Sequence, residues 1–413
     1  MFRAARRIGK ERTDVSIQKS IQLPLFEVLE EVGGRARPSE VYERVADAIG
    51  IGEKSRQETR TCGDGQSYRV FDQQVRWARQ TAVAEGLIAG DRGIWELTDS
   101  AYLKLGKIRR GAVVLIYTTG DGFALWAHAE DAASYIDDGS VQLLMTSPPY
   151  PVVNREYGRF TVEEWLRWMR HCMGIWKSLV ASGGTIAVNL MDVFVQGTPM
   201  LSPYVERFTL SSIDDVGLHF AGRMMWYSPT KLGNIEWTAK RKVHPRNKLE
   251  HVLLFSKAPR PSWDITRIEM PVKSSSGRKV KRDTIRPSGM DICESAFVSG
   301  QGLPSNLIIA GGASGNDTYS RRARDVGIGR HPARFPEAIP RRIIQLATAP
   351  GDICYDPMAG SNTTGKVASE LGRRFIASEP MLEYVRASSL RFSHRSDFRL
   401  KEEIGDVVGS QAQ

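Results

Sequence analysis

The sequence has few cysteines and no long apolar run. Its 413 residues include four cysteines, which are far apart and form no CxxC pair. This spacing predicts neither a disulfide framework nor a zinc site, and it suits a reducing compartment. The longest apolar stretches, such as 112–117, are too short to cross a bilayer. Because no apolar segment follows the basic N-terminal residues, we expect no secretory signal and a cytoplasmic protein.

Basic residues outnumber acidic residues in the sequence. The chain has 57 Lys and Arg against 47 Asp and Glu, for a net charge of +10. An excess of this size suits a polyanionic partner, with nucleic acid first and an acidic membrane surface second, although many basic proteins bind neither. The apolar share of 41% is ordinary for a soluble protein. The length suggests two or three domains.

The N-terminal region divides into a basic arm over 1–19 and a small unit over 20–105. Apolar residues at helical spacing predict helices over Ile21–Val32 and from Pro38 to Ile49, and a third from Asp72, a plausible N-cap, to Gly86. A turn over 90–93 between two short apolar runs predicts a hairpin. The arm is either a phosphate contact or a solvated tail.

Three helices followed by a hairpin is the layout of a winged helix, whose third helix often enters the major groove. The segments LPLFEVLEEVGG, RPSEVYERVADAIG, QVRWARQTAVAEGLI and GIWELTDSA resemble the N-terminal domain of Mrr-type restriction proteins. On this reading Arg76 and Arg79 would face DNA. A protein–protein module is the alternative, because winged helices often serve that role.

After an expected connector over 106–120, strand and helix patterns alternate. Gln142–Met145 predicts a strand, Thr161–Val180 an amphipathic helix ended by Gly183-Gly184, and Thr185–Leu190 a second strand. The alternation favours an α/β fold class, a doubly wound Rossmann-like domain over 121–413. A basic stretch from Lys273 to Arg286 is expected to be a loop.

The segment Thr146-Ser147-Pro148-Pro149-Tyr150 follows an apolar strand directly. The exocyclic amine of cytosine or adenine is a poor nucleophile, so a site that alkylates it must hold its hydrogens with acceptors. Two prolines give a stiff loop without N–H donors. The serine hydroxyl is a further acceptor, and the tyrosine ring can stack on a flipped base. A plain turn is the simpler alternative.

A second constellation lies between Asp352 and Pro380. A short strand ends at Asp356, a loop of small residues follows over 359–363, and the next strand ends near Glu379. Glycine allows a close backbone approach, and an acid about 20 residues after the loop suits a ribose diol. No GxGxxG is present, so the ligand need not carry phosphate. An unoccupied Rossmann-like crossover is the alternative.

Together the two constellations resemble the β-group of amino DNA methyltransferases, in which the catalytic motif precedes the cofactor motif. The resemblance runs from about Asp121 to Phe392. It is greatest to the PvuII-type cytosine-N4 enzymes, on these segments: Thr230-Lys231-Leu232, Ile235-Glu236-Trp237, Lys240-Arg241-Lys242, Arg286 to Ile292, His331 to Pro336 and Gly360 to Gly365.

The resemblance implies a methyl transfer from S-adenosylmethionine to a base amine. It assigns the amine site to Ser147, Pro148, Pro149 and Tyr150. It assigns the cofactor to Asp356, Gly360, Ser361, Asn362, Thr363 and Glu379, with Phe335 and Pro336 nearby. Met358 and Asn362 depart from the wider family, which often has phenylalanine and glycine there. The target-recognition region would span about 228–330, with Lys231, Lys240, Arg241, Lys242, Arg246 and Lys248 facing DNA or forming a solvated basic face.

The implied partner is duplex DNA with a flipped base, in a bacterial protein on the nucleoid. A companion restriction endonuclease is expected, no membrane or metal is expected, and the oligomeric state is open. Serine at the first motif position favours N4 of cytosine, whereas aspartate is usual for adenine N6. The alternatives are an adenine-N6 enzyme, a winged-helix regulator with an inactive α/β domain, and an RNA or protein methyltransferase.

Overall fold

The computed structural model describes residues 20–61, 65–89, 93–153, 160–231, 233–268, 304–312, 317–329 and 331–401. The chain forms two compact units, Met1–Arg110 and Gly111–Gln413. Several sequence predictions lie outside the described residues: the basic arm over 1–19, Leu232, the basic stretch from Lys273 to Arg286, and the motif from Arg286 to Ile292.

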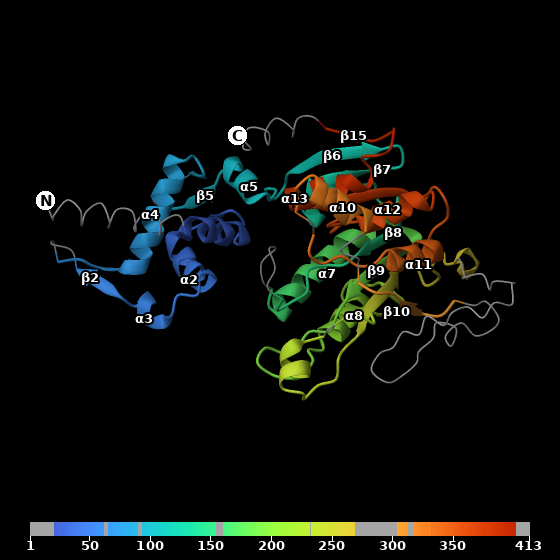
Figure 1. Ribbon diagram of the computed structural model, residues 1–413, viewed down its shortest axis with the longest axis horizontal. Helices are drawn as coiled ribbons and strands as arrows, with labels where there is room; N and C mark the ends of the chain where they lie inside the picture. The colour runs from blue at the N-terminus through green and yellow to red at the C-terminus, as the bar shows by residue number, and fades with distance from the viewer. Residues whose placement is uncertain are drawn as a thin grey trace. The chain divides into compact units, whose positions relative to one another are not determined.

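The first unit contains the three predicted helices followed by the predicted hairpin. A helix over 20–31 precedes α2 (Pro38–Ala48) and α4 (Val70–Ala84), and the hairpin is β4 (Ile88–Ala89) with β5 (Trp95–Leu97) (Figure 1). The sequence reading did not anticipate the other elements: β1 (Arg35–Ala36), α3 (Glu53–Arg56), β2 (Thr59–Thr61), β3 (Ser67–Arg69) and α5 (Asp99–Leu105). β1 pairs with β5, and β2 pairs with β3 in a separate hairpin.

Local sequence sets where these helices begin. Pro38 occupies the first turn of α2, where its missing N–H has no intrahelical partner to lose. The Arg37 N–H instead donates to the carboxylate of Glu40 at 2.8 Å. The helix α4 begins at Val70, two residues before the predicted cap, and Asp72 lies in its first turn. The negative charge of Asp72 in the first turn interacts favourably with the positive end of the helix dipole, so Asp72 can stabilise the helix without being its N-cap.

The second unit is built on a 10-stranded sheet with the order β12-β10-β11-β9-β8-β13-β14-β7-β6-β15. Its central pairs β9–β8, β8–β13, β13–β14 and β14–β7 are parallel. Leu143, Leu144 and Met145 are all fully buried, as expected of a strand covered on both faces. The strands are β6 (Val113–Thr119), β7 (Gly122–Ala127), β8 (Val141–Thr146), β9 (Val180–Leu190), β10 (His219–Tyr227), β11 (Leu249–Ser256), β12 (Leu307–Ile309), β13 (Ile353–Asp356), β14 (Arg374–Glu379) and β15 (Arg399–Leu400).

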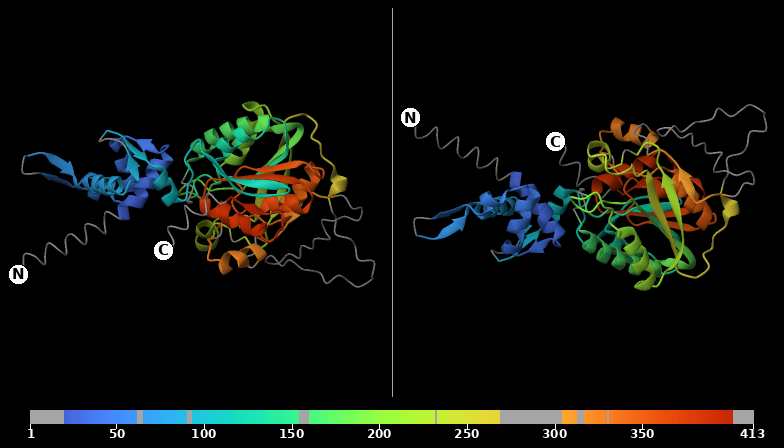
Figure 2. Two further views of the ribbon diagram at one scale, coloured as in Figure 1. Left: turned by 90° about the horizontal axis from the view of Figure 1, so that it is seen from above. Right: turned by 90° about the horizontal axis from the view of Figure 1, so that it is seen from below.

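Helices cover both faces of this sheet (Figure 2). On one face, Trp165 and Trp176 of α7 and Phe208 of α8 pack into the main hydrophobic core with strand residues such as Leu144. The opposite face carries α11 and α12. The helices are α6 (Ala129–Ala132), α7 (Val162–Leu179), α8 (Tyr204–Asp214), α10 (Thr318–Asp325), α11 (Ala338–Ala347), α12 (Thr363–Glu370) and α13 (Leu382–Ser388). Shorter elements are the 3₁₀ helices η1 (Ala133–Tyr135), η3 (Ile265–Arg267) and η4 (Ser389–Arg391) and the π-helix η2 (Ile235–Lys240).

Two local predictions need correction. The expected connector over 106–120 contains β6, because Val113–Thr119 pairs with β7 and becomes part of the sheet. Gly183-Gly184 does not end the preceding helix, which stops at Leu179, but lies inside β9. A Cβ at Gly184 would lie 3.0 Å from the carbonyl oxygen of Gln142. Glycine therefore allows β9 to pass close to β8 at this point.

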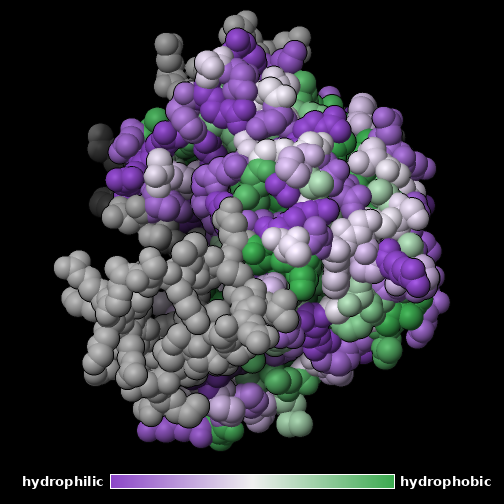
Figure 3. All heavy atoms as spheres, turned by 90° about the vertical axis from the view of Figure 1, so that its right-hand side faces the viewer, coloured by the Kyte–Doolittle hydropathy of each residue, from purple (hydrophilic) through white to green (hydrophobic). Residues whose placement is uncertain are grey.

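The described residues include no candidate for a membrane-spanning helix or for a metal-binding cluster. In the described part of the chain, no helix is long and apolar enough to cross a membrane. Within the same residues, no group of three or more His, Cys, Asp or Glu side chains is arranged to hold a metal ion. On the face drawn in Figure 3, hydrophilic side chains predominate and apolar ones form small separate patches.

Candidate active site

Asp356 ends β13 at the centre of the sheet, with its side chain only 2% exposed. One carboxylate oxygen accepts the Thr364 hydroxyl at 2.6 Å, and the other accepts the Met358 N–H at 3.2 Å. Burial raises the pKa of Asp356 to about 6, and these hydrogen bonds limit the rise. The carboxylate is therefore ionised at neutral pH but poorly solvated, which favours a cationic ligand group.

Glu379 ends the neighbouring parallel strand β14 and is 3% exposed. Its carboxylate accepts the Gly360 N–H at 2.9 Å and the Met381 N–H at 3.0 Å. Gly360 has a φ of +51°, and a Cβ there would lie 3.0 Å from the His331 ring. Glycine at this position therefore allows the His331 ring to pack closely, and Glu379 fixes the backbone of that loop. A close approach of a ligand to Gly360 stays a prediction.

The side chain of Asn362 is fully buried and holds the loop over 359–363 in place. Asn362 has a left-handed backbone (φ 51°) and caps α12 by accepting the Gly365 N–H at 2.9 Å. Its amide nitrogen donates to the Tyr117 hydroxyl of β6 at 3.0 Å. Asparagine is one of the few residues other than glycine that adopt this conformation readily. Its departure from the wider family is therefore accommodated by a helix cap.

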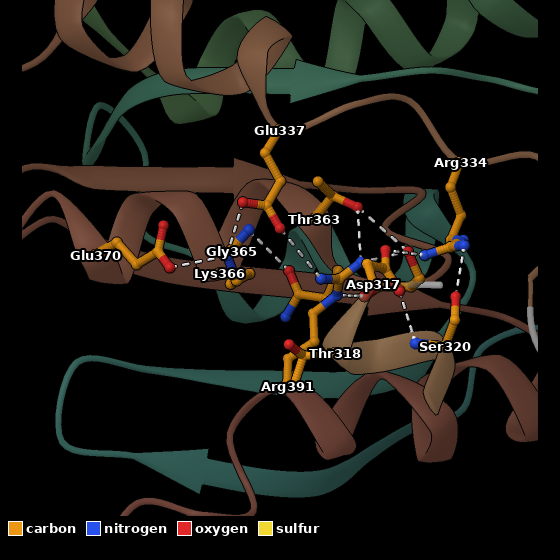
Figure 4. Close-up of polar contacts among 12 residues, drawn as sticks. Asp317, Thr318, Ser320, Arg334, Glu337, Thr363, Gly365, Lys366, Glu370 and Arg391 are labelled. Atoms are coloured by element: carbon orange, nitrogen blue, oxygen red, sulfur yellow. Dashed lines mark hydrogen bonds and ion pairs between the residues drawn. The ribbon is translucent and has the colours of Figure 1, made fainter. Parts of the chain in front are cut away.

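Arg391 forms hydrogen bonds with the same loop over 359–363. Its guanidinium donates to the Ser361 carbonyl at 2.6 Å and to the Thr363 hydroxyl at 3.2 Å. It lies over the ring of Tyr319, and an oxygen of Glu337 is 3.8 Å away. Figure 4 shows the guanidinium of Arg391 joined by dashed lines to Thr363 and to Glu337. Sequence reasoning missed Arg391, which carries no motif.

The segment before α11 is fastened to its surroundings through charged groups. Arg334 pairs with Asp317 of the α10 cap at 2.8 Å and donates to Ser320 at 2.9 Å (Figure 4). Glu337 pairs with Lys366 of α12 at 2.7 Å. Phe335 and Pro336, predicted to lie near the cofactor, are partly exposed between these two anchors.

The donor set at these strand ends fits one class of ligand. Both buried charged groups at the carboxyl ends of β13 and β14, Asp356 and Glu379, are acids. Two carboxylates would repel a phosphate, whereas they favour an ammonium or sulfonium group and the hydroxyls of a ribose. S-Adenosylmethionine has these groups and no phosphate, so the residues present fit it.

The Ser147–Tyr150 segment follows β8, which lies between β9 and β13. The hydroxyls of Ser147 and Tyr150 are 3.2 Å apart. The Trp165 indole donates to the Pro149 carbonyl at 2.6 Å, whereas no donor to the Pro148 carbonyl is found among the described residues. Pro148 therefore supplies the acceptor that remains available, next to the serine hydroxyl.

Two residues that the sequence reading missed complete this part of the site. Asn189 of β9 donates to the Tyr150 hydroxyl at 3.2 Å and to the Glu250 carboxylate at 3.0 Å. Glu250 of β11 accepts the Tyr150 hydroxyl at 3.3 Å, and burial together with this charge raises the pKa of Tyr150. One signal in the sequence could have indicated Glu250: it is an acidic residue near the start of the largely apolar run LEHVLLFS.

The predicted DNA-facing cations differ in their surroundings. Lys231 pairs with Glu250 at 2.9 Å, and Lys248 donates to the Pro229 carbonyl at 2.7 Å. Lys240 and Arg241 both pair with the exposed carboxylate of Glu236. Lys242 and Arg246 are exposed, and no ion pair of either is found in the described part of the chain.

In the first unit, the predicted DNA contacts lie on α4. Arg76 is exposed and donates to the Tyr42 hydroxyl at 2.8 Å, and its guanidinium lies 5.6 Å from the centre of that ring. Arg79 is partly exposed on the same helix. Arg76 lines a hollow of about 520 Å³ together with other residues of β3 and α4, which include Tyr68 and Trp77.

Comparison with known proteins agrees with this architecture. Residues 141–390 match the family model described as DNA methylase, and residues 19–103 match the Mrr N-terminal domain. The type II methyltransferase M.PvuII of Proteus hauseri is 34% identical over 286 residues, which cover 67% of this chain and 85% of that protein. M.BglII of Bacillus subtilis is 28% identical over 250 residues, covering 60% of this chain and 63% of that protein. The solved structure of the PvuII DNA methyltransferase (cytosine-N4-specific) has a TM-score of 0.56 at 29% identity, covering 70% of this chain and 92% of that chain.

Proposed function

Because this chain belongs to the DNA methylase family, we propose that it methylates N4 of a cytosine in duplex DNA with S-adenosylmethionine. The observation that carries the proposal is the position of Ser147 and Tyr150 after β8, directly beside the strand that ends at Asp356. The similarity to M.PvuII supports cytosine as the base.

S-Adenosylmethionine supplies an electrophilic methyl group when it is bound. Asp356 would hold its ammonium group, and Glu379 would hold its ribose and the loop that faces it. Ser361, Asn362 and Thr363 shape that loop through the contacts with Tyr117 and Arg391. Phe335 and Pro336 would cover the adenine or methionine end.

The chain's own residues then orient the base amine. The cytosine leaves the duplex and stacks on Tyr150. The Ser147 hydroxyl and the Pro148 carbonyl accept amine hydrogens, so the nitrogen lone pair can turn toward the methyl carbon. The proton leaves only after the nitrogen has become cationic, so no strong base is required. Orientation of this kind supplies much of the rate enhancement.

DNA is held by cations on both units. Lys242 and Arg246 would contact phosphates near the active site, with Lys240, Arg241 and Lys248 beside them. Contacts of this kind position the duplex without reading its sequence. Arg76 and Arg79 of α4 would give the first unit a second contact, in line with its match to the Mrr N-terminal domain. A companion restriction endonuclease stays a prediction.

The test is to incubate the protein with labelled S-adenosylmethionine and mixed-sequence duplex DNA, and to identify the nucleosides by mass spectrometry. N4-methylcytosine is the expected product. N6-methyladenine would keep the mechanism and overturn the base assignment. Cofactor binding without any methylated nucleoside would favour the alternative of an inactive winged-helix regulator.

A further inference from the structure

The buried carboxylate of Glu250 forms hydrogen bonds with three side chains from segments that are distant in sequence. Glu250 lies at the start of β11, is 7% exposed, and its carboxylate accepts hydrogen bonds from three side chains. These are Lys231 at 2.9 Å, Asn189 at 3.0 Å and Tyr150 at 3.3 Å. A buried carboxylate is stable only when it is paired and hydrogen-bonded, and here Lys231 supplies the opposite charge.

The carboxylate dictates how the Asn189 amide is turned. An ionised carboxylate only accepts hydrogen bonds, so the amide nitrogen of Asn189 must face Glu250 and the amide oxygen must face away. That oxygen is buried and has no hydrogen-bond partner within the described residues. Buried acceptors are rarely left unpaired, and here the bond from the amide nitrogen to a charged acceptor outweighs the loss at the oxygen.

The orientation that Glu250 imposes turns the amide nitrogen of Asn189 toward the proposed amine site. This nitrogen lies 3.5 Å from the Ser147 hydroxyl and donates to the Tyr150 hydroxyl at 3.2 Å. Asn189 therefore transmits the position of Glu250 to both hydroxyls of the motif. The bond from the Tyr150 hydroxyl to Glu250 also restricts the ring on which the base would stack.

We infer that Glu250, with Lys231 as its counter-ion, is a positioning residue for amine methylation. It keeps the amide nitrogen of Asn189 facing the Ser147 and Tyr150 hydroxyls, and it holds the ring of Tyr150 through the bond to the Tyr150 hydroxyl. This inference rests on the proposed function for the identity of the amine. It also changes the expected role of Lys231, which serves the active site rather than a DNA phosphate.

The first experiment compares Glu250→Gln with the wild type. Glutamine can donate as well as accept, so it no longer dictates the orientation of Asn189, and Lys231 loses its counter-charge. We expect kcat to fall at least tenfold, with dissociation constants for S-adenosylmethionine and DNA within threefold of wild type. Glu163→Gln is the matched control, since it removes a carboxylate from an exposed ion pair with Arg207. Wild-type kcat in Glu250→Gln would overturn the inference.

A charge exchange separates positioning from simple loss of structure. Asn189→Asp alone sets two carboxylates within hydrogen-bond distance and should lower both kcat and the melting temperature. The double variant Asn189→Asp, Glu250→Gln restores one acid and one amide, so we expect its kcat to exceed that of either single variant by at least fivefold. A double variant no better than the poorer single variant would contradict the role of Glu250.

A third measurement needs no methyl transfer. Selective ¹⁵N labelling of asparagine allows the Asn189 side-chain amide to be observed by NMR, and the Asn189→Asp variant assigns its signal by removing it. We expect slow hydrogen exchange of this amide in the wild type and at least tenfold faster exchange in Glu250→Gln. Unchanged exchange would refute the positioning role, even if the wild type methylates DNA. A protected amide in a protein without activity would instead place the failure in the proposed function.

Discussion

The guanidinium carbon of Arg391 lies 4.5 Å from the centre of the Tyr319 ring. On the other side of the cluster, the guanidinium of Arg334 lies 5.0 Å from the same ring centre. Arg391 is 7% exposed and has lost most of its hydration. The attraction between a cation and the face of an aromatic ring offsets part of that loss. The ring therefore allows a buried charge to hold the carbonyl of Ser361 in the candidate cofactor loop.

Replacement of Arg391 should loosen that loop. Lysine keeps the charge but cannot donate to the Ser361 carbonyl and the Thr363 hydroxyl in the same planar geometry. We expect Arg391→Lys to lower the free energy of unfolding by about 2–4 kcal/mol and to weaken S-adenosylmethionine binding at least tenfold. Denaturant unfolding and calorimetry measure the two effects. Arg374→Lys, at an exposed position on β14, is the control; an equal effect there would contradict the role of Arg391.

Ionisation of Asp356 should have two opposite effects as the pH rises: the affinity for the cofactor increases, and the free energy of unfolding decreases. In the folded protein the Asp356 carboxyl group keeps its proton up to about pH 6, whereas in the unfolded chain it releases the proton near pH 3.8. The folded state thus binds more protons between these values, and stability falls as the pH rises from about 4 to about 6. Above this window the ionised group costs about 3 kcal/mol.

The variant Asp356→Asn tests both effects. At pH 8 we expect it to be more stable than the wild type, because no charge is buried, and to bind S-adenosylmethionine far more weakly. Wild-type affinity should fall as the pH drops below about 6, whereas the affinity of the variant should change little. Calorimetry at pH 5 to 8 measures this. A variant that binds the cofactor as well as the wild type at pH 8 would refute the role of Asp356.

Ser147→Ala removes an acceptor for the amine without touching the cofactor residues. We expect kcat to fall roughly 100-fold, the scale seen when one oriented hydrogen-bonding group is removed from an active site. The dissociation constant of S-adenosylmethionine should stay within twofold. Single-turnover methylation and cofactor titration test this, and an equal loss of both would contradict the assignment.

Salt dependence should distinguish phosphate contacts from internal ion pairs. Arg246 is exposed, so Arg246→Ala should reduce the slope of log K for DNA against log salt by about one. Lys231→Met should leave this slope unchanged and lower the melting temperature, because Glu250 would lose its counter-charge. Arg260→Ala, an exposed cation outside the cluster, controls for net charge. A full unit of slope lost in Lys231→Met would restore that residue to the DNA contacts.

The sequence by itself determined the local units that carry chemistry. The strand–loop–helix from Ile353 to Glu370 and the Ser147–Tyr150 segment could be predicted because strand periodicity, proline and small residues act over a few neighbouring positions. The order of the two motifs and their similarity to a known family then indicated the reaction.

Only the tertiary structure decided which side chains meet. Asn189 and Glu250 are 61 residues apart, Tyr150 and Glu250 are 100 apart, and Asn362 and Tyr117 are 245 apart. Lys231 looked like a DNA contact among other cations, yet its partner is a buried acid. β6 looked like a connector until its pairing with β7 was seen. Periodicity reports whether a residue is buried, whereas strand order and register determine which partner it finds there.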